Sequence, residues 1–272
     1  MTWLMKRILF FGALVAVAIL PTSCINNRTC GTSSHLQMTF TRDSVSAKTS
    51  AGSLSIAYDA ASDHESQLSI AIDEFLSESL GGTYEGDITV CDSLVAFYQR
   101  QKSDSMTVFY NEYLADSGID AESRCFDEVS YDKIAEGERY VTFLYTETSY
   151  MGGAHGSTIY KGATFRKSDG RRIGWDVVAP DQYSENIQKV IDSGLREYWG
   201  LTPSDNLREY LFDDSKYTVK LPACAPLFGP EGITFIYNEY EIAAYACGRP
   251  SFTVPYSALE PEMMVTARRL ME

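Results

Sequence analysis

The sequence predicts an α+β fold in which helices pack on one face of antiparallel β-sheet. Three observations predict it: an amphipathic helical segment in the first third, a series of strands separated by glycine turns in the middle, and a second helix followed by further strands. Strands and helices are thus segregated along the chain rather than alternating one by one. That order is typical of α+β proteins.

The first third of the chain predicts two short strands and one helix. Apolar residues alternate over residues 36–40 and 54–58, as in half-buried strands. The segment Ser62–Glu65 has serine and glutamate at the spacing of a capping box, and apolar residues at helical spacing follow from Leu68 to Leu80. Gly81 then predicts the end of this helix.

The middle of the chain predicts an antiparallel meander. Residues 94–114 begin with helical spacing, and residues 106–113 fit either a helix or a strand. Four runs with strand character follow, separated by glycine-containing turns: Glu128–Ile134, Arg139–Tyr150, Ser157–Phe165 and Arg171–Trp175. Because each connection is short, neighbouring strands should run in opposite directions.

The C-terminal part predicts helices and then strands. A helix is expected over Asp181–Trp199, with Gly200 beyond its end, and a shorter one is expected to start at Thr202–Asp205. Four strands are expected after Asp214: Tyr217–Leu221, Gly232–Tyr237, Tyr240–Tyr245 and Ser251–Val254.

The N-terminus has the features of an export signal. Lys6 and Arg7 precede an apolar run of 13 residues, Ile8–Leu20, which is shorter than the roughly 20 residues of a membrane-spanning helix. Thr22 and Ser23 stand directly before Cys24. This arrangement resembles the lipobox of bacterial lipoproteins, although Pro21 stands where a leucine is commoner.

The lipobox resemblance implies that residues 1–23 are removed and that Cys24 becomes a lipidated N-terminus. Residues 24–34 are small and polar, as in a flexible tether. The protein is then expected to be exported and held at the cell envelope by acyl chains alone, facing the periplasm or the surface. An ordinary secretory signal followed by an incidental cysteine is the alternative.

The negative net charge of the chain indicates which kinds of binding partner to expect. The formal net charge of the whole chain is −14, and it becomes −16 once Lys6 and Arg7 leave with the signal. Nucleic acid and anionic lipid are therefore poor partners, and a cationic partner is favoured. From Thr49 to Gln99 there are nine Asp or Glu and no Lys or Arg. These acids either solvate the surface or attract a basic ligand.

The stretch "YMGGAHGSTIYKGATF" contains His155 among Gly152, Gly153 and Gly156. Histidine can move protons near neutral pH, so His155 is the best single candidate for a catalytic group. The glycines supply no side-chain partners for it. The interpretation that we favour is a structural turn, in which the glycines permit positive φ and the imidazole binds loop carbonyls.

The stretch "YNEYEIAAYACG" is a candidate ligand-binding strip. Its members are tyrosines and an acid that could line a groove for a sugar or a protein: Tyr237, Tyr240, Glu241 and Tyr245. The interpretation that we favour is that the tyrosine rings fill the core while Asn238 forms a turn. Together with His155, these residues are the candidate binding site.

Other chemistry receives little support. Five cysteines follow Cys24, and Cys224 and Cys247 are a candidate disulfide pair, although spacing alone does not decide the pairing. His35, His64 and His155 have no metal-binding spacing, so no metal is expected. Motifs for serine hydrolases and nucleotide cofactors are also missing. A pair of carboxylates among Glu147, Glu239 and Glu241 remains an open alternative for glycoside hydrolysis.

Two segments resemble the RsiV-like extracellular domain, the DUF3298 family: "YMGGAHGSTIYKGATFRKSDGRRIGWDVV" and "PEGITFIYNEYEIAAYACGRPSFTVPYSAL". The intervening "ENIQKVIDSGLREYWGLT" fits the family's spacing. Residues from Leu36 to about Tyr145 resemble the PdaC-like companion domain, DUF4163, that precedes it. The resemblance implies two domains, residues 35–145 and 146–272.

The resemblance also implies a non-catalytic module that binds or senses something at the envelope. Lysozyme, which some anti-sigma factors of this family bind, or a peptidoglycan-related glycan is the partner it suggests. No transmembrane or sigma-binding segment and no separate deacetylase domain is recognised in the chain. The rival hypothesis is an enzyme that acts on cell-wall polysaccharide through His155 and nearby carboxylates.

Overall fold

The computed structural model describes residues 38–115, 125–215 and 217–272, which form an α+β fold as the sequence predicts. The strands form one six-stranded sheet, in the order β1 to β6, and one three-stranded sheet, β7–β8–β9. Their bounds are β1 (Phe40–Lys48), β2 (Gly52–Ala61), β3 (Cys125–Glu136), β4 (Tyr140–Tyr150), β5 (Ser157–Arg166), β6 (Arg172–Ile173), β7 (Leu227–Phe228), β8 (Ile233–Ile236) and β9 (Ser251–Val254).

The helices are α1 (Gln67–Leu80), α2 (Cys91–Phe109), α3 (Trp175–Val178), α4 (Glu185–Trp199), α5 (Tyr256–Leu259) and α6 (Val265–Arg268). A π-helical turn, η1 (Tyr110–Leu114), continues α2, so the segment that fitted either element is helical. Short 3₁₀ turns are η3 (Leu207–Glu209), η4 (Asp213–Ser215) and η5 (Tyr245–Cys247).

The large sheet departs from the purely antiparallel expectation at one place. β2 and β3 run parallel, with Ile56 opposite Val129, whereas the other neighbouring pairs are antiparallel. The chain between these two strands includes α1 and α2, and a parallel pair needs such a long crossover. The meander over β3 to β6 follows the predicted order.

The first helix begins later than the capping box predicts. Ser66 is the N-cap, and its hydroxyl accepts from the backbone N–H of Ser69 at 3.1 Å. The segment Ser62–Glu65 remains a loop, because the backbone N–H of Glu65 donates to the Asp63 carboxylate in a local turn. Gly81 ends the helix as predicted, with φ of 141°.

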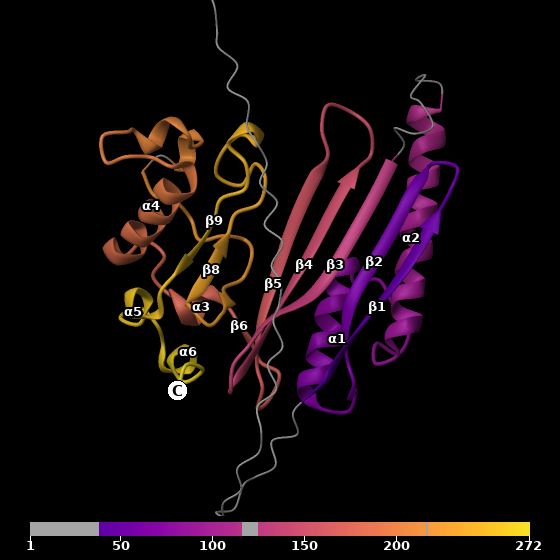
Figure 1. Ribbon diagram of the computed structural model, residues 1–272, viewed down its shortest axis with the longest axis horizontal. Helices are drawn as coiled ribbons and strands as arrows, with labels where there is room; N and C mark the ends of the chain where they lie inside the picture. The colour runs from indigo at the N-terminus through magenta and orange to yellow at the C-terminus, as the bar shows by residue number, and fades with distance from the viewer. Residues whose placement is uncertain (1–37, 116–124, 216) are drawn as a thin grey trace, which may run out of the picture. The chain divides into compact units, whose positions relative to one another are not determined.

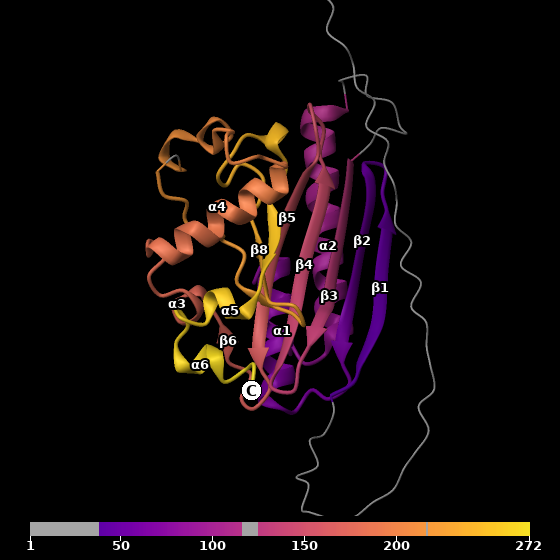
Figure 2. The same ribbon diagram turned by 60° about the vertical axis from the view of Figure 1, so that its left-hand side comes forward.

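One face of the six-stranded sheet packs against α1 and α2 (Figure 1). Val141, Phe143 and Tyr145 alternate along β4 and are buried with apolar residues of both helices. Figure 2 shows these helices behind the sheet, while β8, α4 and α5 lie on its other side. The apolar face of β4 therefore belongs to the helix-covered core.

The opposite face of β4 and β5 carries the C-terminal part of the chain. Thr142 donates from its hydroxyl to the carbonyl of Phe228 at 2.8 Å. Thr164 accepts from the Phe228 backbone N–H at 3.1 Å and donates to the Pro226 carbonyl at 2.9 Å. These buried threonines join β7 to the large sheet, because they satisfy backbone groups that a strand edge would otherwise leave unpaired.

Helix α4 packs on the three-stranded sheet. Its expected C-terminus is confirmed at Gly200, and its N-cap is Ser184, whose hydroxyl accepts from the N–H of Ile187. Gly194 lies so close to β9 that a Cβ atom there would be 2.2 Å from the Phe252 ring. A side chain at this helix position would therefore push α4 away from the sheet.

Three expected C-terminal elements are wrong. Residues 202–205 form a turn, in which the Asp205 carboxylate binds the Thr202 N–H and hydroxyl, and the next helical turn, η3, is capped by Asn206. The described residues between 217 and 221 form no strand. The segment Tyr240–Tyr245 turns instead, since Tyr240 has a φ of +61°.

The expected boundary between residues 145 and 146 falls inside β4, so it does not separate two domains. The six-stranded sheet runs across it, and residues 38–272 form one unit. The expected signal, Cys24, the expected tether and Cys30 lie outside the described residues. Among the residues that the structure describes, no helix has both the length and the apolar character to cross a bilayer.

Candidate functional site

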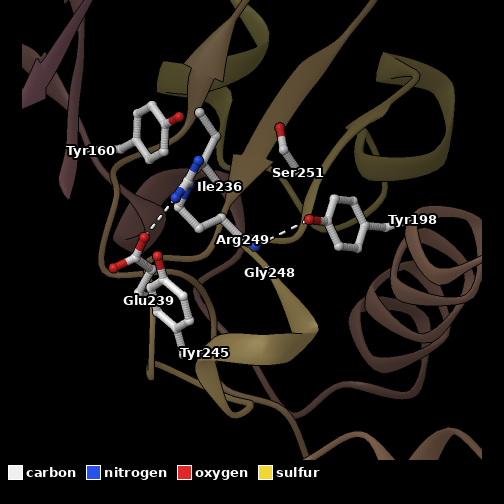
Figure 3. Close-up of a pocket in the computed structure, with 8 residues that line it drawn as sticks. All are labelled: Tyr160, Tyr198, Ile236, Glu239, Tyr245, Gly248, Arg249 and Ser251. Carbon is white, nitrogen blue, oxygen red and sulfur yellow. Dashed lines mark hydrogen bonds and ion pairs between the residues drawn. The ribbon is translucent and has the colours of Figure 1, made fainter. Parts of the chain in front are cut away.

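A pocket of about 390 Å³ opens between β5, the end of α4 and the loops of the small sheet. Its walls are aromatic and polar side chains together with one isoleucine and one glycine: Tyr160, Tyr198, Ile236, Glu239, Tyr245, Gly248, Arg249 and Ser251. Figure 3 shows Tyr198 reaching in from α4 and Arg249 pointing toward Glu239. Three tyrosines around one ion pair give the pocket both apolar faces and hydrogen-bonding groups.

Arg249 and Glu239 form the charged part of the pocket. The guanidinium donates to the Glu239 carboxylate at 2.6 Å, and its Cζ lies 5.9 Å from the centroid of the Tyr160 ring. Burial, the largest single effect, acts to lower the pKa of Arg249, but the interactions with Glu239 and Tyr160 together outweigh it and the pKa is raised. The arginine thus remains a cation whose orientation is set by the carboxylate.

Gly248 permits the contact between this loop and α4. It has a φ of +79°, and a Cβ atom there would lie 2.5 Å from the Tyr198 hydroxyl. That hydroxyl accepts from the Arg249 backbone N–H at 3.1 Å. The glycine therefore lets Tyr198 and Arg249 share one wall of the pocket.

His155 lies beside this pocket, in the turn between β4 and β5. Its ring stacks on Tyr245 with centroids 3.7 Å apart and planes 17° apart, and Tyr245 also lines the pocket. His155 Nδ1 is 2.9 Å from the Gly156 carbonyl, which can only accept, so Nδ1 donates. In the neutral ring, Nε2 then accepts from the Tyr240 hydroxyl at 3.2 Å.

The glycines around His155 shape its turn. Gly152 and Gly153 have φ of +88° and +102°, which favour glycine. Gly156 has ordinary φ, but a Cβ atom there would lie 2.8 Å from the Ser149 carbonyl. His155 itself is exposed at the tip of the turn.

The turn that carries Tyr240 is fastened to the edge of β5. The Asn238 side chain accepts from the Tyr160 N–H at 2.7 Å and donates to the Tyr160 carbonyl at 3.1 Å. Glu241 accepts from the N–H groups of Asn238 and Ala223 at 2.8 and 2.6 Å. These bonds bring Tyr240 next to His155, 85 residues away in the sequence.

The structure divides the candidate binding strip. Tyr240 and Tyr245 contact His155, but Tyr237 is fully buried and donates to the Lys220 carbonyl at 2.8 Å. Burial raises the pKa of Tyr237, as expected for a core phenol. Glu241 binds two backbone N–H groups. Tyr237 and Glu241 therefore stabilise the backbone around the site, and neither side chain lines the pocket.

The candidate disulfide between Cys224 and Cys247 is absent, since both thiols are free. Cys224 packs with Leu227 and Ile236, and burial raises its pKa to about 12. Cys247 instead contacts the Tyr210 carbonyl at 3.7 Å. The two side chains point into different surroundings, so neighbouring loops do not bring the sulfur atoms together.

The three acids considered for glycoside hydrolysis do not form a catalytic pair. Glu147 accepts from Lys102 at 2.6 Å, Glu241 binds backbone, and Glu239 alone lines the pocket. Hydrolysis by two carboxylates requires both to face the same sugar. The described residues that line this pocket include no second acid.

Sequence reasoning missed the roles of Tyr160, Tyr198 and Arg249. One signal was present: Arg249 is the only Lys or Arg between Lys220 and Arg268, in a segment with five acidic residues. A single basic residue in such a segment is a candidate for a specific ion pair. Tyr160 and Tyr198 have no comparable signal in the sequence. Their spacing along a strand and a helix is the same whether a side chain enters the core or lines a pocket.

The fold and the pocket together define a class of α+β protein. A large mixed sheet is covered by helices on one face, and a tyrosine-lined pocket lies beside a small C-terminal sheet. Residues 176–257 match the family model described as "Protein of unknown function (DUF3298)", so this part of the chain is a DUF3298 domain. The match includes Tyr198, Glu239 and Arg249 but not His155 or Tyr160. No curated protein matches the sequence.

Two crystal structures of DUF3298 family proteins are similar over most of the chain. One, from Bacteroides fragilis NCTC 9343, is 19% identical with a TM-score of 0.66, and the match covers 87% of this chain and 98% of that one. The other, from Pseudomonas aeruginosa PAO1, is 14% identical with a TM-score of 0.53 and covers 84% and 95%. At these identities the likeness establishes the fold alone, and it extends well beyond residues 176–257.

Proposed function

We propose that the protein is an exported, lipid-anchored binding protein of the bacterial cell envelope whose tyrosine-lined pocket binds a sugar unit of cell-wall polymer. The observation that carries this proposal is the position of Tyr245, which stacks on His155 and lines the pocket. Aromatic faces beside a charged pair supply the apolar contact and hydrogen bonds that a sugar ring needs. Export and anchoring rest on residues 1–24.

Binding is favoured over catalysis by the partners of His155. Its two ring nitrogens face the Gly156 carbonyl and the Tyr240 hydroxyl, and neither of these two partners is a carboxylate. Glu239, the acid in the pocket, is paired with Arg249. A general base needs a free site near the reacting proton, and a hydrolase of this kind needs two acids.

The test is titration calorimetry with the disaccharide unit of peptidoglycan, using the chain without residues 1–24. Tyr245→Ala should weaken binding about tenfold, the loss expected for one aromatic contact of about 1.4 kcal/mol. Tyr183→Ala is the matched control, because Tyr183 is 52% exposed and does not line the pocket. Equal affinity of Tyr245→Ala and wild type would place the ligand elsewhere.

The rival enzyme is tested in the same preparation. Incubation with purified peptidoglycan should release no soluble sugar or peptide from either the wild type or His155→Ala. Release by the wild type that is lost in His155→Ala would replace the binding proposal with a catalytic one.

Lysozyme is a second candidate partner, favoured by one observation, the net charge of −14 on the whole chain. Opposite charge accelerates encounter mainly at low ionic strength. Calorimetry with lysozyme at low and at physiological salt tests it: heat at both identifies a specific partner, whereas heat at neither removes lysozyme from consideration.

A further inference from the structure

A second pocket, of about 400 Å³, lies on the helix-covered side of the fold, where the loop before α1 meets the start of α2. Three potential metal ligands converge there. Asp73 Oδ2 is 3.0 Å from His64 Nδ1, and Asp73 Oδ1 is 3.3 Å from Cys91 Sγ. One ligand atom from each residue lies within 4.8 Å of the other two. His64 and Cys91 also line the pocket.

His64 Nδ1 and Cys91 Sγ each contact one of the two carboxylate oxygens of Asp73, at separations near those between neighbouring ligands of one zinc ion. Zinc–ligand bonds of about 2.0–2.3 Å place neighbouring ligand atoms about 3.3–3.8 Å apart in a tetrahedral site. The two distances from Asp73 are close to this range. Asp73 and Cys91 are held in helices, whereas His64 stands in a loop and its side chain is 34% exposed.

The charges of the cluster also fit a divalent cation. A thiolate, a carboxylate and a neutral imidazole together carry two negative charges, which one such ion neutralises. Asp73 is 1% exposed, and the ion pairs among the described residues include none between Asp73 and a lysine or arginine. The pocket is lined by Asp43 and Asp92, with no Lys or Arg among its described residues.

We infer that His64, Asp73 and Cys91 bind a divalent transition-metal ion of the zinc class, with a fourth coordination position facing the second pocket. Nitrogen, oxygen and sulfur ligands in one set select zinc or a similar ion over magnesium and calcium, which prefer oxygen alone. Three protein ligands with one open position allow a water or a small ligand to complete the shell.

Cobalt absorption and zinc calorimetry on the full chain, after removal of bound metal with a chelator, test this inference. Cobalt(II) should bind with a stoichiometry of one and show a thiolate charge-transfer band, and Cys91→Ser should lose that band. His64→Ala should weaken zinc binding about 100-fold or more, because the loss of a partner outside the coordination shell already costs about 10–100-fold.

Two matched variants serve as controls. His155→Ala removes a histidine that lies beside the other pocket, and Cys125→Ser changes a buried free thiol outside the cluster, so both should bind zinc like the wild type. His64 is partly exposed, and circular dichroism should show His64→Ala folded. The absence of a thiolate band in the wild type, or equal zinc affinity in wild type and His64→Ala, overturns the inference.

Discussion

The imidazole ring of His155 stacks nearly parallel on the phenol ring of Tyr245, with centroids 3.7 Å apart. The stack joins the β4–β5 turn to the loop that carries the pocket, although the two residues are ninety positions apart. It therefore sets the orientation of a pocket wall from outside the pocket.

His155→Ala should lower the affinity for the pocket ligand about fivefold, because an aromatic pair contributes about 1 kcal/mol. His155→Phe keeps the ring contact and should retain most of the affinity. Calorimetry on both variants measures the effect. If His155→Phe binds as weakly as His155→Ala, the hydrogen bonds of the imidazole matter more than its stacking.

Arg249→Met should destabilise the fold, because it leaves the Glu239 carboxylate, only 6% exposed, without its cationic partner. The expected loss in free energy of unfolding is about 1–2 kcal/mol, less than for a fully buried pair because Arg249 is 37% exposed. Urea unfolding measures it. Lys189→Met, which breaks an exposed pair with Glu185, should leave the stability nearly unchanged, because solvent screens that pair.

The ion pair between Lys102 and Glu147 should make the free energy of unfolding depend on pH. Burial, the largest single effect, acts to raise the pKa of Glu147. The hydrogen bond and charge of Lys102, the Tyr145 hydroxyl and the charge of Lys161 together outweigh burial and lower the pKa below the ordinary 4.5. Burial lowers the pKa of Lys102, but Asp127 and Glu147 raise it above the ordinary 10.5. Because its pKa is lowered, Glu147 stabilises the fold above pH 4.5, and this contribution is lost as the pH falls. Because its pKa is raised, Lys102 stabilises the fold below pH 10.5, and this contribution is lost as the pH rises.

Glu147→Gln should therefore cost about 2 kcal/mol at pH 7. The difference from wild type should shrink as pH falls below 4.5, where Glu147 itself becomes protonated, and again above 10.5. Chemical unfolding across this range measures it. A difference independent of pH would mean that the Lys102–Glu147 pair contributes no charge interaction.

Gly194→Ala should destabilise the protein by about 2 kcal/mol, although the same change normally stabilises a helix by up to about 1 kcal/mol. The new methyl group would meet the Phe252 ring at 2.2 Å. Thermal unfolding compares it with Gly229→Ala, where the nearest atom to the new Cβ would be 3.7 Å away. A stabilised Gly194→Ala would show that α4 can move away from β9 without loss.

Cys24→Ser should abolish lipid attachment and release the exported protein from membranes, because acyl chains are the proposed anchor. Mass spectrometry of the mature protein and detergent-phase partition measure the two effects. Cys30→Ser is the control and should remain anchored. Lipid-free wild-type protein would contradict the lipobox interpretation.

Helix α4 and the β3 to β6 meander followed closely from local pattern. Their signals, the apolar period, the glycine turns and the C-terminal Gly200, act within a few residues of the element they define. The start of α1 and the Tyr240 turn did not follow. In both places, a side chain bound nearby backbone groups, Asp63 for the first and Glu241 for the second, and displaced the expected element.

The sequence predicts only part of the candidate site, and it does not predict the cluster of His64, Asp73 and Cys91. His155, Tyr240 and Tyr245 were recognised as unusual residues, but Tyr198 and Tyr160 looked like ordinary positions of a helix and a strand. His64, Asp73 and Cys91 are separated by nine and eighteen residues and lie on three different segments, so they match no spacing motif.

The sequence by itself determined the α+β class, the meander and the acidic character, because each depends on neighbouring residues or on composition. The proposed export signal with its Cys24 rests on the same kind of local information. Only the tertiary structure decided which side chains meet: His155 with Tyr245, Arg249 with Glu239, and His64 with Asp73 and Cys91. These meetings depend on how the sheets and helices pack over long sequence separations, and local periodicity carries no information about that packing.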